Sequence, residues 1–264
     1  MLTFKFVQHS AVAGIVGLLG LLNAHSSQAG VMNGDFEDGF AGYSTIGDTI
    51  VHTGSFESNY GGGHSEAVIS NTPGAEVDFT FSGNPAVSTA NLETFLGLSA
   101  GSFDAIASDS VIEGSAIQQT FYGNANDILS FDFQFLTDED VFAGSNRPNA
   151  NFNDLAFFTV QFNNSPAYIF QLADTFSNFS NSNTPFIYET NGQNTALSLA
   201  QSGYYTIGFG VLDVGDESFA SSLLLDNIGV TSSEPVPEPA TMLGLTAFSF
   251  GAFMKRRQKQ KAKA

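Results

Sequence analysis

Side chains that commonly act as nucleophiles or general bases are scarce in this chain. It has no cysteine, and of its four histidines only His52 and His64 lie beyond residue 29. The run 63–67, Gly-His-Ser-Glu-Ala, matches part of the G-x-S-x-G turn that presents a nucleophilic serine, but alanine stands in place of the second glycine. Two histidines alone also make a poor catalytic zinc site. The sequence therefore argues against serine and cysteine hydrolases and against zinc enzymes.

Carboxylates, in contrast, are abundant. Of 26 Asp and Glu residues only Glu238 lies outside residues 30–234, and of 8 Lys and Arg residues only Arg147 lies inside them, so these residues carry 1 − 25 = −24. Such a charge repels phosphate backbones, which argues against nucleic acid as a partner, and it attracts divalent cations. Solubility is the simpler explanation for most of the charge. Because a glycosidase needs only two carboxylates roughly 5–10 Å apart, a glycan-cleaving enzyme stays open.

The C-terminal residues form three consecutive segments of different chemistry. Pro237, Glu238 and Pro239 come first, and the residues from Pro239 to Met254 carry no charge. As a helix, this apolar run would be about 24 Å long, slightly short of the hydrocarbon thickness of a bilayer. Six cations follow within residues 255–264. The positive-inside rule keeps this basic end in the cytoplasm, so the preceding residues are expected outside.

This order of motif, apolar helix and basic end resembles the PEP-CTERM sorting signal of exported Gram-negative and cyanobacterial proteins. The resemblance implies that an exosortase, a membrane-embedded cysteine protease-transpeptidase, acts near Pro237, Glu238 and Pro239. It also implies that the helix 239–254 anchors the protein transiently in the inner membrane. An ordinary C-terminal anchor with a proline-rich spacer is the alternative.

The N-terminus predicts export by a second, independent signal. Lys5 precedes an apolar run from Ala11 to Leu22, and the small residue Ala29 suits a signal-peptidase site. The chain therefore divides into a signal peptide at 1–29, a β-sandwich ectodomain at 30–233 and a sorting tail at 234–264. The ectodomain is expected at the cell surface or in the extracellular matrix.

Between these ends the composition predicts an all-β fold, with 27 Phe and 27 Gly. In residues 127–136 the odd positions from Leu129 to Phe135 are apolar and the even positions from Ser130 to Gln134 are polar, which indicates a central strand. Residues 89–98 place apolar side chains at helical spacing and predict a short helix. Similar alternation predicts strands at 76–81, 116–122, 154–162, 167–172, 204–211 and 222–230.

Two segments resemble the first and last strands of carbohydrate-binding-module-like jelly rolls. Residues 31–40 contain Asn, then Phe-Glu, then Gly and an aromatic, and residues 223–230 read Leu-Leu-Leu-Asp-Asn-Ile-Gly-Val. The resemblance implies a jelly-roll-like β-sandwich whose first and last strands are neighbours, with a structural calcium at Glu37 and Asp226. In a strand, Asp35 and Glu37 would share the face opposite Phe36. Acidic edge residues that simply face water are the alternative.

Aromatic side chains are the sequence feature that bears most on ligand binding. Trp is absent, so tyrosines are the candidate platforms for sugar rings, namely Tyr60, Tyr188 and Tyr204. Because Tyr204 and Tyr205 are adjacent in a predicted strand, one of them belongs to the core. The sequence favours a non-enzymatic polysaccharide-binding or matrix-binding protein. The alternatives are a glycan-active hydrolase or lyase on the same sandwich, and a purely structural surface protein.

Overall fold

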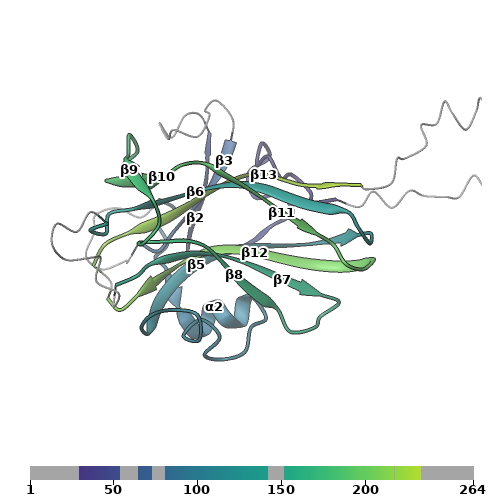
Figure 1. Ribbon diagram of the computed structural model, residues 1–264, viewed down its shortest axis with the longest axis horizontal. Coiled ribbons are helices and arrows are strands. Elements are labelled where there is room, and N and C mark those ends of the chain that lie inside the picture. Colours follow the sequence, from purple (N-terminus) through teal and green to yellow (C-terminus); the bar gives the residue numbers. More distant parts are fainter. Residues whose placement is uncertain (1–29, 54–64, 73–80, 142–151, 217, 233–264) are drawn as a thin grey trace, which may run out of the picture.

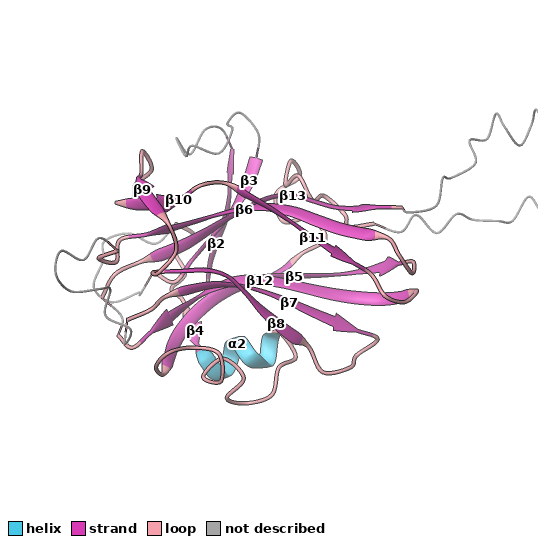
Figure 2. Cartoon of the chain, in the orientation of Figure 1, coloured by secondary structure: helices cyan, strands magenta, loops and turns pink. Residues whose placement is uncertain are grey.

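The computed structural model of the protein describes residues 30–53, 65–72, 81–141, 152–216 and 218–232. In these residues two antiparallel β-sheets lie face to face, and one short helix lies on the outside of one sheet (Figures 1 and 2). The all-β, two-sheet sandwich with a short helix that the sequence predicts is therefore confirmed.

We call the two sheets sheet A and sheet B. Strands that follow each other in the sequence often lie in different sheets. Sheet A has the order β1-β5-β12-β7-β8, with β4 also paired to β5. Its strands are β1 Ser44–Ile46, β4 Val87–Ser88, β5 Val111–Gly123, β7 Leu155–Phe162, β8 Tyr168–Asp174 and β12 Gly203–Val214. Sheet B has the order β2-β3-β13-β6-β10-β9, with β11 also paired to β6. Its strands are β2 Asp48–Thr53, β3 Ser65–Ser70, β6 Ile128–Thr137, β9 Phe179–Asn181, β10 Tyr188–Thr190, β11 Gln193–Ser198 and β13 Ser221–Thr231.

The core between the sheets is built mainly from phenylalanine. The apolar residues of β6 from Leu129 to Phe135 all point into it, as their alternation predicts. The ring of Phe131 lies 4.8 Å from that of Phe209 on β12, edge to face, and 5.1 Å from that of Phe158 on β7. Such offset contacts add to the hydrophobic gain from burial, so β6 holds the two sheets together at their centre.

The helix α2, Thr89–Phe95, covers part of the outer face of sheet A (Figure 2). Glycines in the strands beneath it leave room for its leucines. A β-carbon added to Gly114 would lie 2.9 Å from Leu92, and one added to Gly208 would lie 2.6 Å from Leu96. Both distances are below normal van der Waals contact. The glycines therefore fix how closely the helix packs on the sheet.

The helix ends earlier than predicted, at Phe95 instead of Leu98. Gly97 has a φ of +67°, and the backbone N–H groups of Gly97 and Leu98 donate to the carbonyls of Thr94 and Glu93 at 3.2 and 2.8 Å. This is the Schellman arrangement in which a glycine in the left-handed region ends a helix. The helical spacing of apolar residues continues past the glycine to Leu98. A prediction from that spacing therefore ends the helix too late.

Five of the predicted strands are present with small shifts of their ends, as are the central strand and the helix. Residues 76–80 of the predicted strand 76–81 lie outside the described residues, and Phe81 lies in a bend. The remaining strands were not predicted, because they are short or lack a clear apolar alternation. These are β1, β2, β3, β4, β9, β10 and β11.

The expected opening strand at residues 31–40 is wrong, because this segment is a series of turns. The expected separation of side chains nevertheless holds: Phe36 is fully buried, while Asp35 and Glu37 are exposed. Phe36 has a φ of +54°, which is turn geometry. The first strand β1 lies in sheet A and the last strand β13 in sheet B, so the two are not paired. The turns still reach the last strand, since Ile228 N donates to the Gly34 carbonyl at 2.9 Å.

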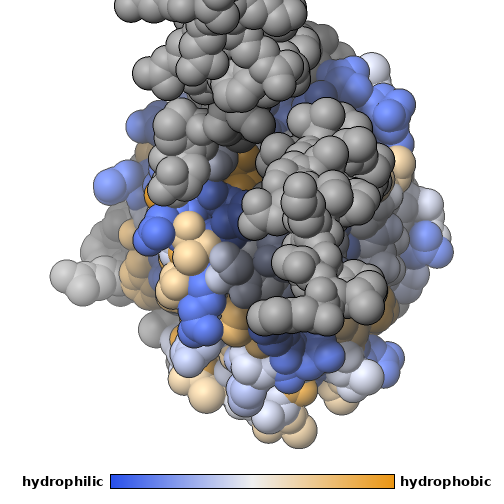
Figure 3. Space-filling model, turned by 90° about the vertical axis from the view of Figure 1, so that its right-hand side faces the viewer, coloured by the Kyte–Doolittle hydropathy of each residue, from blue (hydrophilic) through white to orange (hydrophobic). Residues whose placement is uncertain are grey.

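The predicted signal peptide at 1–29 and sorting tail at 234–264, including the motif 237–239 and the helix 239–254, lie outside the described residues. Within the ranges given above, no helix is both long and apolar enough to cross a membrane. Viewed from one end of the sandwich, hydrophilic and hydrophobic residues are interspersed over the visible described surface (Figure 3).

Candidate functional site

A polar groove of about 320 Å³ lies on the outer face of sheet A, beside the C-terminal end of α2. Its described lining contains amides, hydroxyls and backbone, and none of these residues is ionisable at neutral pH. Neutral amides and hydroxyls are the groups that hydrogen-bond neutral polar ligands. The lining residues are Gly42, Ser44, Thr94, Phe95, Leu96, Gly97, Gln118, Gln119, Thr120, Gln161 and Thr206.

The strand register brings the floor of the groove together. Thr206 on β12 lies opposite Thr120 on β5 and Gln161 on β7. The neighbouring residues Tyr205 and Ile207 point into the core, so these three side chains point outward. The hydroxyls of Thr120 and Thr206 are hydrogen-bonded at 2.7 Å. The result is a row of neutral polar side chains across three strands.

The end of α2 forms one wall of the groove. The Gln118 side-chain amide donates to the Phe95 carbonyl at 2.8 Å, which joins the helix end to β5. A β-carbon at Gly97 would lie 3.5 Å from Nε2 of Gln161, so the helix end also closely approaches β7. No hydrogen bond of the Gln161 amide to a described residue is present, which leaves that amide available to a ligand.

Tyr204 extends the groove with an exposed aromatic ring. It precedes Thr206 by two residues on the same outward face, about 7 Å along the strand. Its side chain is 62% exposed, whereas Tyr205 is buried with 6% exposed, so the expected division between these two tyrosines is confirmed. Tyr122 on β5 contacts the Tyr204 ring edge to face, with 5.5 Å between ring centroids.

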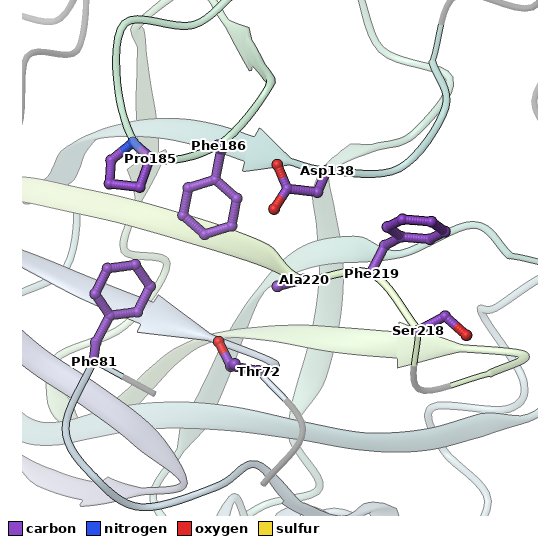
Figure 4. Close-up of a pocket in the computed structure, with 8 residues that line it drawn as sticks. All are labelled: Thr72, Phe81, Asp138, Pro185, Phe186, Ser218, Phe219 and Ala220. Atoms are coloured by element: carbon purple, nitrogen blue, oxygen red, sulfur yellow. The ribbon is translucent and has the colours of Figure 1, made fainter. Parts of the chain in front are cut away.

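A second cavity, of about 400 Å³, is largely apolar and lies over sheet B, where β6 ends and β13 begins (Figure 4). Phe81 and Phe186 stack with ring centroids 5.9 Å apart and form one wall. Asp138 accepts a hydrogen bond from Ile187 N at 2.7 Å, and burial raises the pKa of its carboxyl. We call this cavity the aromatic pocket. Its described lining residues are Thr72, Phe81, Asp138, Pro185, Phe186, Ser218, Phe219 and Ala220.

The structure does not bring the three candidate tyrosines together. Tyr204 lies on the outer face of sheet A, beside the polar groove. Tyr188 is half-buried on β10 in sheet B, paired with Thr137 and Asn181, and it does not line the groove. Tyr60 lies outside the described residues.

The two candidate calcium ligands both lie near the start of β3. Glu37 accepts hydrogen bonds from the backbone N–H and the hydroxyl of Ser65, at 3.0 and 3.4 Å. Asp226 is close to Glu66, the residue that follows Ser65. Burial and the Asp226 charge raise the pKa of Glu66 to about 7. Within the described ranges, no group of three or more His, Cys, Asp or Glu is arranged to hold a metal ion.

A separate set of buried carboxyls lies where β5 and β7 begin and β12 ends. Asp213 faces Glu113 across the strand pair, and its Oδ2 has no hydrogen-bond partner among the described residues. Burial raises the pKa of Asp213, and the charges of Asp154, Glu113, Asp216 and Glu139 raise it further. Burial also raises the pKa of Asp154, although its carboxylate accepts hydrogen bonds from Ser221, Val214 and Asn71. None of the residues in this set lines either cavity.

The residues that line both cavities were not predicted from the sequence. Gln118, Thr120, Gln161 and Thr206 occupy the polar positions of predicted strands, but an alternating pattern does not tell which strands pair or in what register. The only signal for the groove in the sequence was therefore the presence of polar residues at outward positions of three predicted strands. The aromatic pocket is assembled from loops at the ends of strands, for which periodicity gives no information.

No family model matches the chain, and no curated protein matches it. Solved structures give weak matches. The structure of TmCBM61 in complex with β-1,4-galactotriose is 11% identical, with 78% of this chain and 100% of that chain covered and a TM-score of 0.40. A cleaved adhesin domain of Lys-gingipain from Porphyromonas gingivalis is 9% identical over 76% of this chain and 96% of that chain, with a TM-score of 0.37. The enzymatically active domain of tailspike protein 4 from bacteriophage CBA120 is 8% identical over 74% of this chain and 21% of that chain, with a TM-score of 0.34. Similarity this low assigns neither a family nor a ligand to this chain.

Proposed function

We propose that residues 30–233 form a non-catalytic domain, jelly-roll-like in its architecture, that binds a neutral polysaccharide in the polar groove on the outer face of sheet A. The observation that carries this proposal is the groove itself. Its floor presents the Thr120 and Thr206 hydroxyls and the Gln161 amide, and the exposed ring of Tyr204 lies beside it. Amides and hydroxyls can bond sugar hydroxyls, while an aromatic ring can pack against the apolar face of a sugar.

Charge selects the class of polysaccharide. Residues 30–234 carry a net charge of −24, so uronic or sulfated chains are repelled unless divalent ions intervene. The described lining of the groove adds no charge of its own. Because tyrosine provides the platform in place of tryptophan, we expect affinities nearer millimolar than nanomolar, on the order of −4 to −6 kcal/mol.

Binding is favoured over cleavage because glycoside hydrolysis requires a pair of carboxyl groups on either side of the scissile bond. The described lining of the groove has no carboxyl, and that of the aromatic pocket has one, Asp138. The buried carboxyl set around Asp213 lines neither cavity. These observations support a binding protein, not a hydrolase or lyase.

The export and sorting parts of the proposal rest on the sequence. The segments 1–29 and 234–264 support export and sorting by an exosortase acting near Pro237, Glu238 and Pro239, with a cell-surface or matrix location. Structural calcium at Glu37 and Asp226 is supported by their approach to the adjacent residues Ser65 and Glu66. Carboxylates of this kind are suitable calcium ligands, with water and backbone oxygens completing the coordination. Intact-mass analysis of the secreted protein, which should lack residues 255–264, tests the sorting tail.

Affinity electrophoresis of the full-length protein tests the proposed function. Gels containing neutral or acidic polysaccharides, each with and without calcium, are combined with an assay for new reducing ends. Retardation in at least one neutral polysaccharide without new reducing ends supports the proposal. New reducing ends indicate a hydrolase, unsaturated products indicate a lyase, and no retardation in any polysaccharide indicates a structural surface protein.

A further inference from the structure

The aromatic pocket combines several apolar rings with a single carboxylate. Figure 4 shows the Asp138 carboxylate between the rings of Phe186 and Phe219, with Ala220 between the same two residues. Phe81 stacks on Phe186 on the other side, at 5.9 Å. Phe219 is 53% exposed and Phe186 only 4%, so the aromatic surface runs from the rim into the interior of the cavity.

The carboxylate of Asp138 is only partly satisfied by the protein. Oδ1 accepts a hydrogen bond from Ile187 N at 2.7 Å, and Oδ2 has no hydrogen bond to a described residue. The described ranges contain no Lys or Arg, so they offer this carboxylate no permanent cation. Burial raises the pKa of Asp138, which means that its charge is poorly solvated. A cation brought in by a ligand would relieve that cost.

Further negative charge lies near the pocket. Asp140 follows Asp138 by two residues, and Asp216 accepts a hydrogen bond at 2.8 Å from the backbone of Ser218 on the pocket rim. Such a field raises the local concentration of cations and repels anions. Charge complementarity therefore selects a cationic ligand, and the apolar rings select one whose charge is carried by an organic group.

We propose that the aromatic pocket binds an organic ammonium cation, with Asp138 as its counterion and the faces of Phe186 and Phe219 contacting its alkyl groups. Quaternary and methylated ammonium groups are recognised in this way, because the negative face of an aromatic ring attracts a weakly hydrated cation. A bare metal ion would instead require several oxygen ligands, and a lone carboxylate among phenyl rings does not supply them. The cavity of about 400 Å³ is within the usual size range for small ligands.

The test is a titration of the full-length protein with choline, followed by ligand-observed NMR. The reference ligand is the uncharged carbon isostere of choline, in which carbon replaces the ammonium nitrogen. Both ligands have the same shape, so a difference between them reports the charge. We expect choline to bind about tenfold more tightly than the isostere, and added salt to weaken only the choline complex.

Two variants and two matched controls locate the site. Asp138→Asn keeps an oxygen that can accept the Ile187 hydrogen bond but removes the charge, and Phe219→Leu keeps the apolar volume but removes the ring. Each variant is expected to weaken choline binding by several-fold up to about tenfold. Asp138→Asn should have little effect on binding of the uncharged isostere. Asp38→Asn, in the exposed N-terminal turns, and Phe170→Leu, at a ring that is 44% exposed in sheet A, should leave choline binding unchanged.

Equal affinity for choline and its isostere would overturn the proposal, as would the absence of choline binding. Unchanged choline affinity in a folded Asp138→Asn variant would also overturn it. Thermal unfolding of each variant establishes whether it is folded. Should Asp138→Asn fail to fold, the wild-type comparison of the two ligands and the half-exposed Phe219→Leu variant still decide the outcome.

Discussion

Tyr122 and Tyr204 lie directly opposite each other on β5 and β12, and their rings meet edge to face with 5.5 Å between centroids. Both point to the outer face of sheet A, where Tyr204 is 62% exposed. Tyr122 therefore orients the ring that lies beside the polar groove. This contact links the architecture of sheet A to the proposed binding of a polysaccharide.

Replacing Tyr122 should weaken polysaccharide binding although Tyr122 does not line the groove. Tyr122→Ala removes an aromatic pair worth roughly 0.5–1.5 kcal/mol beyond simple burial, so Tyr204 becomes less well oriented. We expect a loss of affinity of a few-fold, measured by affinity electrophoresis. Tyr122→Phe keeps the ring and should bind like the wild type. An unchanged affinity in Tyr122→Ala would show that Tyr204 needs no orientation by its neighbour.

Gly208 controls the position of α2, which forms a wall of the groove. In Gly208→Ala the new β-carbon would lie 2.5 Å from Oγ1 of Thr159 and 2.6 Å from Leu96, so these side chains, or the helix that carries Leu96, must shift. Overpacking of this kind costs about 1–3 kcal/mol, which urea unfolding would detect. Gly229→Ala is the matched control, because a β-carbon there meets no atom within 4 Å. Equal stability of the two variants would contradict the described packing of α2 on sheet A.

Stability should fall as the pH rises, because several carboxyls have pKa values raised in the folded protein. Burial and neighbouring charges raise the pKa of Glu139 to about 8 and of Glu66 to about 7, and raise those of Asp154 and Asp213 as well. A group with a raised folded pKa contributes its full stability below its unfolded pKa, near 4, and loses it as the pH rises through the folded value. Melting temperatures measured with chelator should therefore decrease from pH 5 to pH 9.

Asp213 provides a site-specific test of this pH dependence. The carboxyl faces Glu113, Asp154, Asp216 and Glu139, and Asp213→Asn replaces it with a group that never ionises. The variant should be more stable than the wild type at pH 8 by roughly 1 kcal/mol or more, and little changed at pH 4. Asp38→Asn, at an exposed position, should change stability at neither pH. A variant less stable than the wild type at pH 8 would contradict the raised pKa of Asp213.

Calcium should stabilise the protein through Glu37 and Asp226. Linkage gives about 2.7 kcal/mol when calcium is at one hundred times its dissociation constant, which corresponds to a rise of several degrees in melting temperature. The double variant Glu37→Gln and Asp226→Asn should lose this rise, whereas Asp38→Asn should retain it. The same melting curve for the wild-type protein with calcium and with chelator would refute the site.

The sequence was sufficient to predict the sandwich because its long central strands alternate without interruption. The apolar residues at alternate positions of β6, from Leu129 to Phe135, pack in the core as the two-residue period predicts. Tyr205 on β12 also packs in the core. The turns at residues 31–40 were mistaken for a strand. Phe36 is buried in a turn with a φ of +54°, and a buried residue between two exposed ones gives the same alternation in a turn as in a strand.

The groove could be predicted only in part. Tyr204 was named as a candidate platform, and the sequence required only that one of Tyr204 and Tyr205 belong to the core; the structure shows that the buried one is Tyr205. The partners of Tyr204 depend on the register that sets Thr120, Thr206 and Gln161 side by side, and on Gly208, which lets α2 close one wall. Both are long-range relationships that single-sequence periodicity does not contain.

The most direct test of the central claim compares two exposed tyrosines on opposite faces of sheet A. Tyr204 is 62% exposed beside the groove, and Tyr168 is 69% exposed on β8, opposite Val160, whose side chain points to the inner face. Affinity electrophoresis in the neutral polysaccharide that retards the wild-type protein most strongly should show about tenfold weaker binding for Tyr204→Ala and wild-type binding for Tyr168→Ala. Wild-type retardation of a folded Tyr204→Ala variant would contradict polysaccharide binding at the groove.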